Sequence, residues 1–225
     1  CAAADFSAQT LSSSARTSAA TSVGEAPPFT LIDTGFGGSF EPFYLYSRMR
    51  GVELAMEDRA ERPEFLECAL QRIFDIHYTL IERTLTAGKG GVDFIYIAED
   101  LGSQESLLFS PGMFRQFLKP RMKKMIELVH RHGAFAFHHD DGAIFTIIPD
   151  LLDAGIDILN PVQWRGAGMD RAKLKSTFGS KVAFHGAMDN QQTLPFRTTA
   201  EVRAEVRENA RILGVGGGYI LAPCH

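Results

Sequence analysis

Five short apolar segments of this chain each run directly into residues that can bind a metal ion or move a proton. The segments are 94–98, 134–137, 156–159, 182–184 and 219–222. The residues that follow them are, in the same order, ED (99–100), HHDD (138–141), NPVQ (160–163), HGAMD (185–189) and PCH (223–225). A parallel α/β barrel carries its active site at the carboxyl ends of its strands, so this pattern is what such an enzyme should show.

Helical patterns alternate with these segments. The longest predicted helix begins at Pro63 and runs to about residue 87, with apolar residues recurring at three- and four-residue steps. The other predicted helices span 41–57, 111–132, 144–155, 170–178 and 199–213, and residues 29–32 form a weaker strand candidate. The alternation of strand and helix predicts a parallel sheet with helical crossovers.

The number of strands decides between two parallel folds. Five firm strands and one weak strand fall short of the eight in a (β/α)8 TIM barrel, and we therefore expect an incomplete barrel from a chain that is a fragment. Both ends fit this expectation, because the chain starts at Cys1 and stops at His225 on a strand-end motif. The alternative is a doubly wound open sheet, which usually carries a glycine-rich turn after its first strand. No GxGxxG or GxxxxGK[ST] motif is present.

The length, charge and composition of the chain exclude several classes of protein. With 225 residues and 45% hydrophobic residues, the chain can form one domain with a substantial core. The net charge of −4 provides no basic surface field, which argues against nucleic-acid binding. No segment has 18 consecutive apolar residues, so no membrane span is expected. Three scattered cysteines do not suggest a disulfide framework, and we expect a protein of the reducing cytoplasm.

The first 28 residues differ from the rest. They are rich in Ala, Ser and Thr and end in two prolines, without the basic start and apolar core of a secretory signal. We expect residues 1–28 to be disordered or foreign to the fold, and residues 29–225 to form the partial barrel domain.

The HHDD run at 138–141 is the densest group of candidate ligands. Side chains two residues apart on a strand share a face, so His139 pairs with Asp141. Zinc accepts an imidazole nitrogen and a carboxylate oxygen, and catalytic sites usually add a third protein ligand and leave one position open. Cys224 or His225, at the last strand end, is the candidate third ligand. The alternative interpretation is a solvated turn whose acids cap the next helix.

Two other strand ends offer proton-transfer and orienting groups. Glu99 and Asp100 are candidates for a general base or for a carboxylate that holds a cationic group. The alternative for them is a turn in which Asp100 caps backbone amides. Asn160 and Gln163 offer amides that can orient a substrate carboxylate or carbonyl, whereas the alternative is a turn shaped by Pro161.

The fifth strand end contributes His185 and Asp189, which flank Gly186. Asp189 is a catalytic candidate, and Gly186 has no side chain to prevent a ligand from approaching the backbone. A single histidine such as His185 is more typical of a structural role.

Several motifs together carry a resemblance to a known family. They are, in chain order, RGVEL (50–54), PEF (63–65), EDLGSQ (99–104), SP (110–111), FLKP (117–120), HDDG (139–142), DLLDAGIDILNPVQ (150–163), FHGAMD (184–189) and GGGYILAPCH (216–225). Their order and spacing, over about residues 36–225, resemble the uroporphyrinogen decarboxylase superfamily. This superfamily includes the tetrapyrrole decarboxylase and the corrinoid-linked methyltransferases, which share a (β/α)8 barrel with a cleft at the carboxyl ends of its strands.

The resemblance implies two chemistries. The methyltransferases of the family bind zinc through His-x-Cys and a later Cys, so that His139 and Asp141 would be ligands here, with Asp in place of Cys. Cys224 or His225 falls near the later ligand. A carboxylate makes the site harder and favours zinc as a Lewis acid over zinc as a thiol activator. Methyl transfer with a corrinoid carried by a partner protein, or with a methylated small molecule, is our first functional hypothesis.

The second chemistry is metal-free decarboxylation of a porphyrinogen in porphyrin biosynthesis. The family enzyme uses an arginine-rich N-terminal segment, an aspartate and a late histidine, and the nearest residues here are Asp100 and His225. A third hypothesis is a barrel that binds a tetrapyrrole or corrinoid without catalysis. In the methyl-transfer hypothesis, Glu99 or Asp100 would handle protons and Gln163 would orient the substrate.

Overall fold

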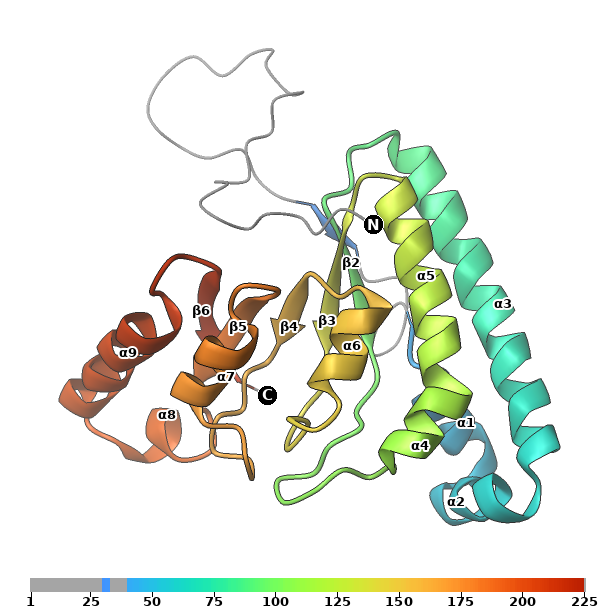
Figure 1. Ribbon diagram of the computed structural model, residues 1–225, viewed down its shortest axis with the longest axis horizontal. Coiled ribbons are helices and arrows are strands. Elements are labelled where there is room, and N and C mark those ends of the chain that lie inside the picture. Colours follow the sequence, from blue (N-terminus) through green and yellow to red (C-terminus); the bar gives the residue numbers. More distant parts are fainter. Residues whose placement is uncertain (1–29, 33–39, 225) are drawn as a thin grey trace.

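The computed structural model describes residues 30–32 and 40–224, in which six strands form one parallel sheet (Figure 1). The strands are β1 (Leu31–Ile32), β2 (Phe94–Ala98), β3 (Phe135–His139), β4 (Ile158–Asn160), β5 (Ala183–Met188) and β6 (Tyr219–Pro223). Each strand pairs in parallel with the next strand of the chain. A doubly wound sheet reverses its strand order at a switch point, and a barrel does not. The sequential order therefore confirms the prediction of a partial barrel.

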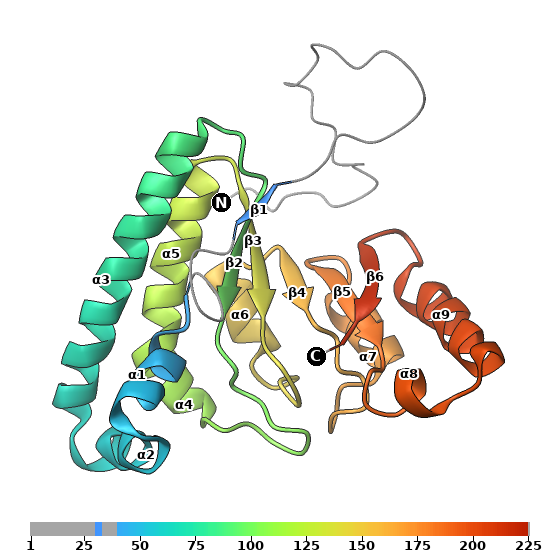
Figure 2. The ribbon, with the colours of Figure 1, turned by 180° about the vertical axis from the view of Figure 1, so that it is seen from behind.

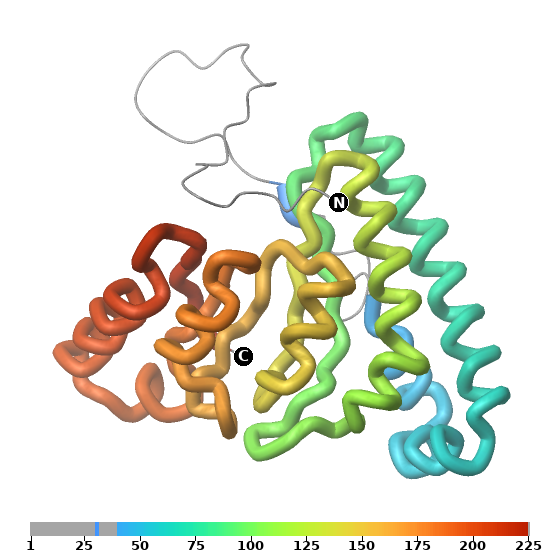
Figure 3. Tube along the Cα trace, viewed as in Figure 1, coloured from blue at the N-terminus to red at the C-terminus, as the bar shows by residue number. Residues whose placement is uncertain are grey.

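Helices connect the strands and cover one face of the sheet. They are α1 (Pro42–Arg50), α2 (Val52–Glu61), α3 (Pro63–Gly88), α4 (Pro111–Met113), the π-helix η1 (Phe114–Leu118), α5 (Lys119–Arg131), α6 (Ile148–Ala154), α7 (Arg171–Phe178), α8 (Thr193–Phe196) and α9 (Thr199–Leu213). Seen from behind, the opposite face of the sheet is covered by none of the helices that the structure describes (Figure 2). The Cα trace places α1, α2 and α3 at one end of the molecule and α9 at the other (Figure 3).

The core follows from the alternation of side chains along the strands. The larger apolar cluster lies between the sheet and its helices and includes Ile95, Ile97 and Phe184. A smaller cluster on the other face is centred on Phe94, Phe137 and Ile158, with partly buried neighbours Tyr96, Phe135 and Ala183. Successive strand residues point to opposite faces, so strands β2 to β5 contribute to both clusters. The face with the smaller cluster is called the inner face below.

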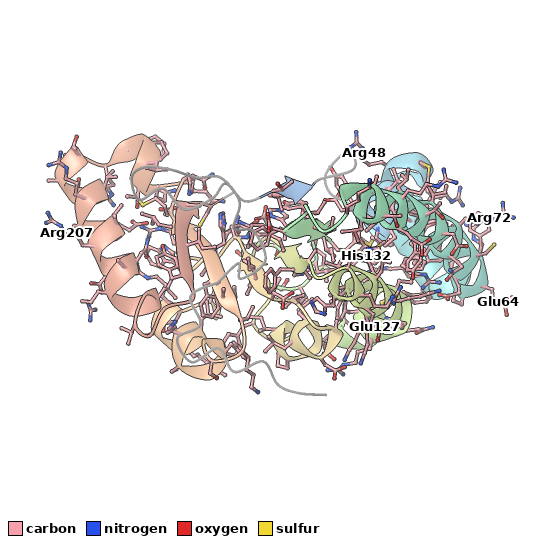
Figure 4. The ribbon with its side chains drawn as sticks, turned by 90° about the horizontal axis from the view of Figure 1, so that it is seen from above. Arg48, Glu64, Arg72, Glu127, His132 and Arg207 are labelled. Carbon is pink, nitrogen blue, oxygen red and sulfur yellow. The ribbon has the colours of Figure 1, made fainter. Side chains whose placement is uncertain are left out.

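Charged helix surfaces point outward, as Figure 4 shows for Arg72 and Arg207. Arg207 belongs to the Arg203/Arg207/Arg211 stripe, which is exposed, and Arg211 pairs with Glu208 at 2.6 Å. Helix α9 begins with a capping box between Thr198 and Glu201. No helix among the described residues is both long and apolar enough to cross a membrane.

Several predicted boundaries were wrong for local reasons. The helix predicted over 41–57 is two helices, because Gly51 takes a positive φ of 89°. The helix predicted over 111–132 contains η1, just before Pro120, which has no amide hydrogen to donate to the preceding turn. The helix predicted over 144–155 begins only at Ile148, and α8 had no clear signal. The predicted domain boundary near residue 28 lies outside the described residues.

Candidate functional site

The register of β2 and β3 separates the ionisable side chains at their ends onto two faces. Ala98 is the partner of His139, so Asp100 and Asp141 follow on the inner face with His139. Glu99 alternates to the helix-covered face, where it is 1% exposed. Residues adjacent in sequence therefore enter different environments.

Three side chains converge at the inner face. The Nε2 atom of His139 lies 3.6 Å from Asp100 Oδ1 and 4.0 Å from Asp141 Oδ1. One ligand atom from each of these residues lies within 4.8 Å of the other two. The predicted pair His139 and Asp141 is thus brought together, and Asp100, predicted for proton transfer, joins them. An imidazole nitrogen and two carboxylate oxygens are a donor set that suits a divalent cation.

The loop after β2, which carries Asp100, and the loop after β3, which carries Asp141, are in backbone contact. This contact holds the two carboxylates in place. A Cβ atom added to Gly142, which has φ +81°, would lie 2.3 Å from the carbonyl oxygen of Ser103. A Cβ atom added to Gly102 would lie 2.3 Å from the carbonyl oxygen of Asp141. The Ala143 amide donates to Ser103 O at 2.7 Å. Glycine is needed at both positions for the loop after β2 to lie against the loop after β3.

Asn160 holds the other edge of the His139 ring. His139 Nδ1 lies 2.7 Å from Asn160 Oδ1, and Asn160 Nδ2 lies 2.6 Å from His185 Nδ1. A ring nitrogen that faces a carbonyl oxygen must carry the hydrogen, which in the neutral ring leaves the lone pair on His139 Nε2, facing the carboxylates. This is how outer groups orient an imidazole ligand in metal sites. Sequence reasoning assigned Asn160 to the substrate instead.

Gln163 contacts a candidate ligand directly. Its Nε2 atom donates to Asp141 Oδ1 at 3.0 Å, and its Oε1 atom accepts from the amide of Gly142 and from Gln104 Nε2, each at 2.9 Å. These contacts hold the Asp141 carboxylate in one orientation. The predicted role of Gln163 in orienting substrate stays a prediction.

The Glu99 carboxylate lies on the helix-covered face and caps a helix. Its carboxylate accepts from the backbone amides of Phe43 at 3.0 Å and Tyr44 at 2.9 Å, and so caps the first turn of α1. Burial raises the pKa of Glu99 to about 8, against the two amide hydrogen bonds that act to lower it. Because this carboxyl points away from the inner face, Asp100 is the member of the predicted proton-transfer pair that lies at the cluster, and its role stays a prediction.

Asp189 also has its oxygens engaged by the fold. It accepts from Arg165 Nε at 2.6 Å and from the amides of Gln191 and Thr193, each at 3.0 Å, at the start of α8. Burial alone would raise the pKa of Asp189, but these donors outweigh burial and lower it. The structure thus gives Asp189 a capping position, and its predicted catalytic role stays a prediction.

Cys224 lies beside the cluster but outside its three-residue group. Its thiol donates to the carbonyl oxygen of Val162 at 3.2 Å, and it lines a small cavity together with Gln163. Burial, with the nearby charge of Asp189 as a smaller contribution, raises the pKa of Cys224 to about 12. Asp100, and not Cys224, is the third member of the three-residue group, and the prediction of Cys224 or His225 as a third ligand stays a prediction. His225 lies outside the described residues.

Parallel strands in chain order, with a His/Asp/Asp cluster at their carboxyl ends, define a barrel-type α/β protein with candidate metal ligands at one rim. The family model described as uroporphyrinogen decarboxylase (URO-D) matches residues 33–225. The chain belongs to this family.

Two curated relatives are similar to most of this chain. The chain is 27% identical, over 187 residues, to the methylcobamide:CoM methyltransferase MtaA of Methanosarcina barkeri, and 26% identical to the same enzyme of strain Fusaro. Each alignment covers 83% of this chain and 51% of the relative. A solved methyltransferase from Methanosarcina mazei superposes with a TM-score of 0.64 at 25% identity, over 82% of this chain and 51% of that one. The chain spans about half the length of these relatives.

Proposed function

We propose that this protein takes part in methyl transfer at a divalent metal ion held by His139, Asp100 and Asp141. The observation that supports this most is the convergence of His139 Nε2 on the two carboxylates while its Nδ1 is held by Asn160. The similarity to relatives named as methylcobamide:CoM methyltransferases supports the reaction class. The partner would be a corrinoid protein or a methylated small molecule.

The donor set decides what the metal would contribute. Zinc accepts imidazole and carboxylate ligands, and once bound it would act as a Lewis acid on a substrate atom. The resemblance described in the sequence analysis implies that Asp141 replaces a cysteine of the family's methyltransferases, and two hard carboxylates favour polarising an oxygen over activating a sulfur. Gln163 keeps the Asp141 carboxylate oriented, and Asn160 keeps the lone pair of His139 facing the site.

Metal binding tests the site without any substrate. We expect the metal-stripped protein to bind about one zinc ion per chain by calorimetry, and His139→Ala, Asp100→Asn and Asp141→Asn each to weaken binding about tenfold or more. The matched control is Asp153→Asn, the same chemical change at a side chain that is 63% exposed and pairs with Lys119 outside the cluster. Wild-type affinity in Asp100→Asn and Asp141→Asn would refute the ligand assignment.

A second assay tests the reaction. Zinc-loaded protein, incubated with cob(I)alamin and a methoxy compound, should form methylcobalamin and the corresponding alcohol in step with its zinc content, and the same variants should lose this activity. Metal-independent loss of carboxyl groups from a porphyrinogen, with no demethylation, would instead favour the decarboxylase of the family.

A further inference from the structure

We propose that Asn160 is a positioning residue that gives the two histidines beside it opposite roles. It fixes His139 as a metal ligand through Nε2, and it fixes His185 as a hydrogen-bond donor through Nε2–H toward the substrate. The first half rests on the proposed function, whereas the second half concerns His185, which sequence reasoning treated as structural.

The strand register places these three residues in one row. His139 of β3 is the partner of Asn160 of β4. On the next pair of strands Leu159 is the partner of Phe184, so Asn160 lies beside His185 of β5. All three side chains point to the inner face, where the same row continues to Ala98 on one side and Ile220 on the other. One amide therefore stands between two imidazoles as a cross-strand neighbour of both.

An amide side chain is the group that can hold two imidazoles differently. Asn160 offers Oδ1, which only accepts, to His139 and Nδ2, which only donates, to His185, at 2.7 and 2.6 Å. His139 Nδ1 must then carry hydrogen and His185 Nδ1 must carry a lone pair. In the neutral ring the remaining hydrogen of His185 sits on Nε2. Asn160 is 8% exposed and His139 is 5% exposed, so water competes little for these bonds.

The surroundings of His185 are those expected of a side chain that contacts the substrate. Its half-buried ring packs edge-on against Phe137 at a centroid distance of 5.0 Å, on the face where Tyr96 lies 5.5 Å from the His139 ring. Burial, and then the neighbouring His139, lower the pKa of His185, which favours the neutral ring. A neutral Nε2–H selects a substrate that presents an acceptor oxygen beside the metal and disfavours an ammonium group at that position.

The tautomers can be read directly. In metal-free protein with 15N-labelled histidine, long-range 15N–1H spectra should show His139 with hydrogen on Nδ1 and His185 with hydrogen on Nε2, assigned through His139→Gln and His185→Gln. Asn160→Asp replaces the donor by an acceptor and should move the His185 hydrogen to Nδ1. Asn209→Asp is the matched control, because Asn209 is also buried but bonds Arg171 and the carbonyl oxygen of Ala187. It should leave both histidines unchanged.

Two binding readouts separate the roles. Asn160→Leu, which can hold neither ring, should weaken zinc binding by about 10–100-fold. His185→Phe should leave the zinc affinity unchanged but raise the KM of the methyl-transfer substrate about tenfold, and His185→Gln, which keeps an N–H donor, should restore part of it. Far-UV circular dichroism and urea midpoints must match the wild type for a variant to be compared.

The outcomes distinguish this inference from the proposed function. Hydrogen on Nδ1 of His185 in the wild type, or no change in Asn160→Asp, would overturn the inference even if zinc binds. The expected tautomers in a protein that binds no zinc would support the effect of Asn160 on both rings and the second half of the inference, and would overturn the proposed function together with the first half, which rests on it.

Discussion

Gly142→Ala tests whether the contact between the loops after β2 and β3 builds the site. Alanine at φ +81° costs about 1–2 kcal/mol, because a left-handed conformation crowds Cβ. The new Cβ would also lie 2.3 Å from Ser103 O, and that atom is backbone that accepts from the Ala143 amide. Overpacking of this kind costs about 1–3 kcal/mol more. We therefore expect a loss of about 2–5 kcal/mol, or about 5–20 °C in Tm for a domain of this size.

Gly133→Ala is the control that isolates the loop contact. Gly133 has φ +75°, and a Cβ added there would meet nothing within 4 Å. This variant should show only the conformational cost of about 1–2 kcal/mol. Urea unfolding followed by circular dichroism measures both variants under the same conditions, and their difference gives the steric contribution.

The two glycine variants should also differ in metal binding. Pushing Gly142 away from Ser103 moves the loop that carries Asp141 away from the loop that carries Asp100, so Gly142→Ala should bind zinc more weakly than Gly133→Ala. If the two variants unfold at the same urea concentration and bind zinc equally, the packed loops do not assemble the cluster, and the argument from backbone contact is wrong.

Two further predictions concern stability away from the site. Thr198→Ala removes the capping box of α9 and should cost about 1 kcal/mol in the free energy of unfolding, measured by urea titration. The hydrogen bond that His130 Nε2 donates to Asp157 holds the pKa of His130 above its usual 6.5, so the folded state binds the proton more tightly than the unfolded state. The stability difference between wild type and His130→Gln should be fully present below about pH 6.5 and disappear as pH rises through the folded pKa. A difference that grows above pH 7 would contradict this sign.

The sequence was sufficient for the architecture because parallel strands are buried on both faces and read as continuous apolar runs. It also paired His139 with Asp141, since that pairing needs only the period of two along a strand. The same period separates Glu99 from Asp100, so the signal that places them on different faces was present in the sequence. Gly51 and Pro120, which explain two wrong helix boundaries, were visible too, but their local effects depend on the chain around them.

Other features had no local signal. Asp100 and Asp141 meet because two loops about 40 residues apart pack through glycine backbones, and that contact is tertiary. The bridging role of Asn160 depends on the relative register of three strands, and a shift of one residue would turn its side chain to the other face. Sequence reasoning identified the residue types that the site needs, but register and loop contact decided which of them meet.

A buried side chain on the helix-covered face holds the loop that carries Asp100 of the inner-face cluster. Asp140 is fully buried, and its Oδ1 atom accepts from the amide of Leu101 at 2.9 Å, one residue beyond Asp100. Asp140→Ala would leave that amide without its acceptor, at a cost of about 1–3 kcal/mol, and would release the loop that carries Asp100. Asp140→Asn keeps a carbonyl oxygen for Leu101 and should retain most of the zinc affinity that Asp140→Ala loses. If calorimetry shows wild-type zinc affinity in Asp140→Ala, the position of Asp100 does not depend on this buried hydrogen bond.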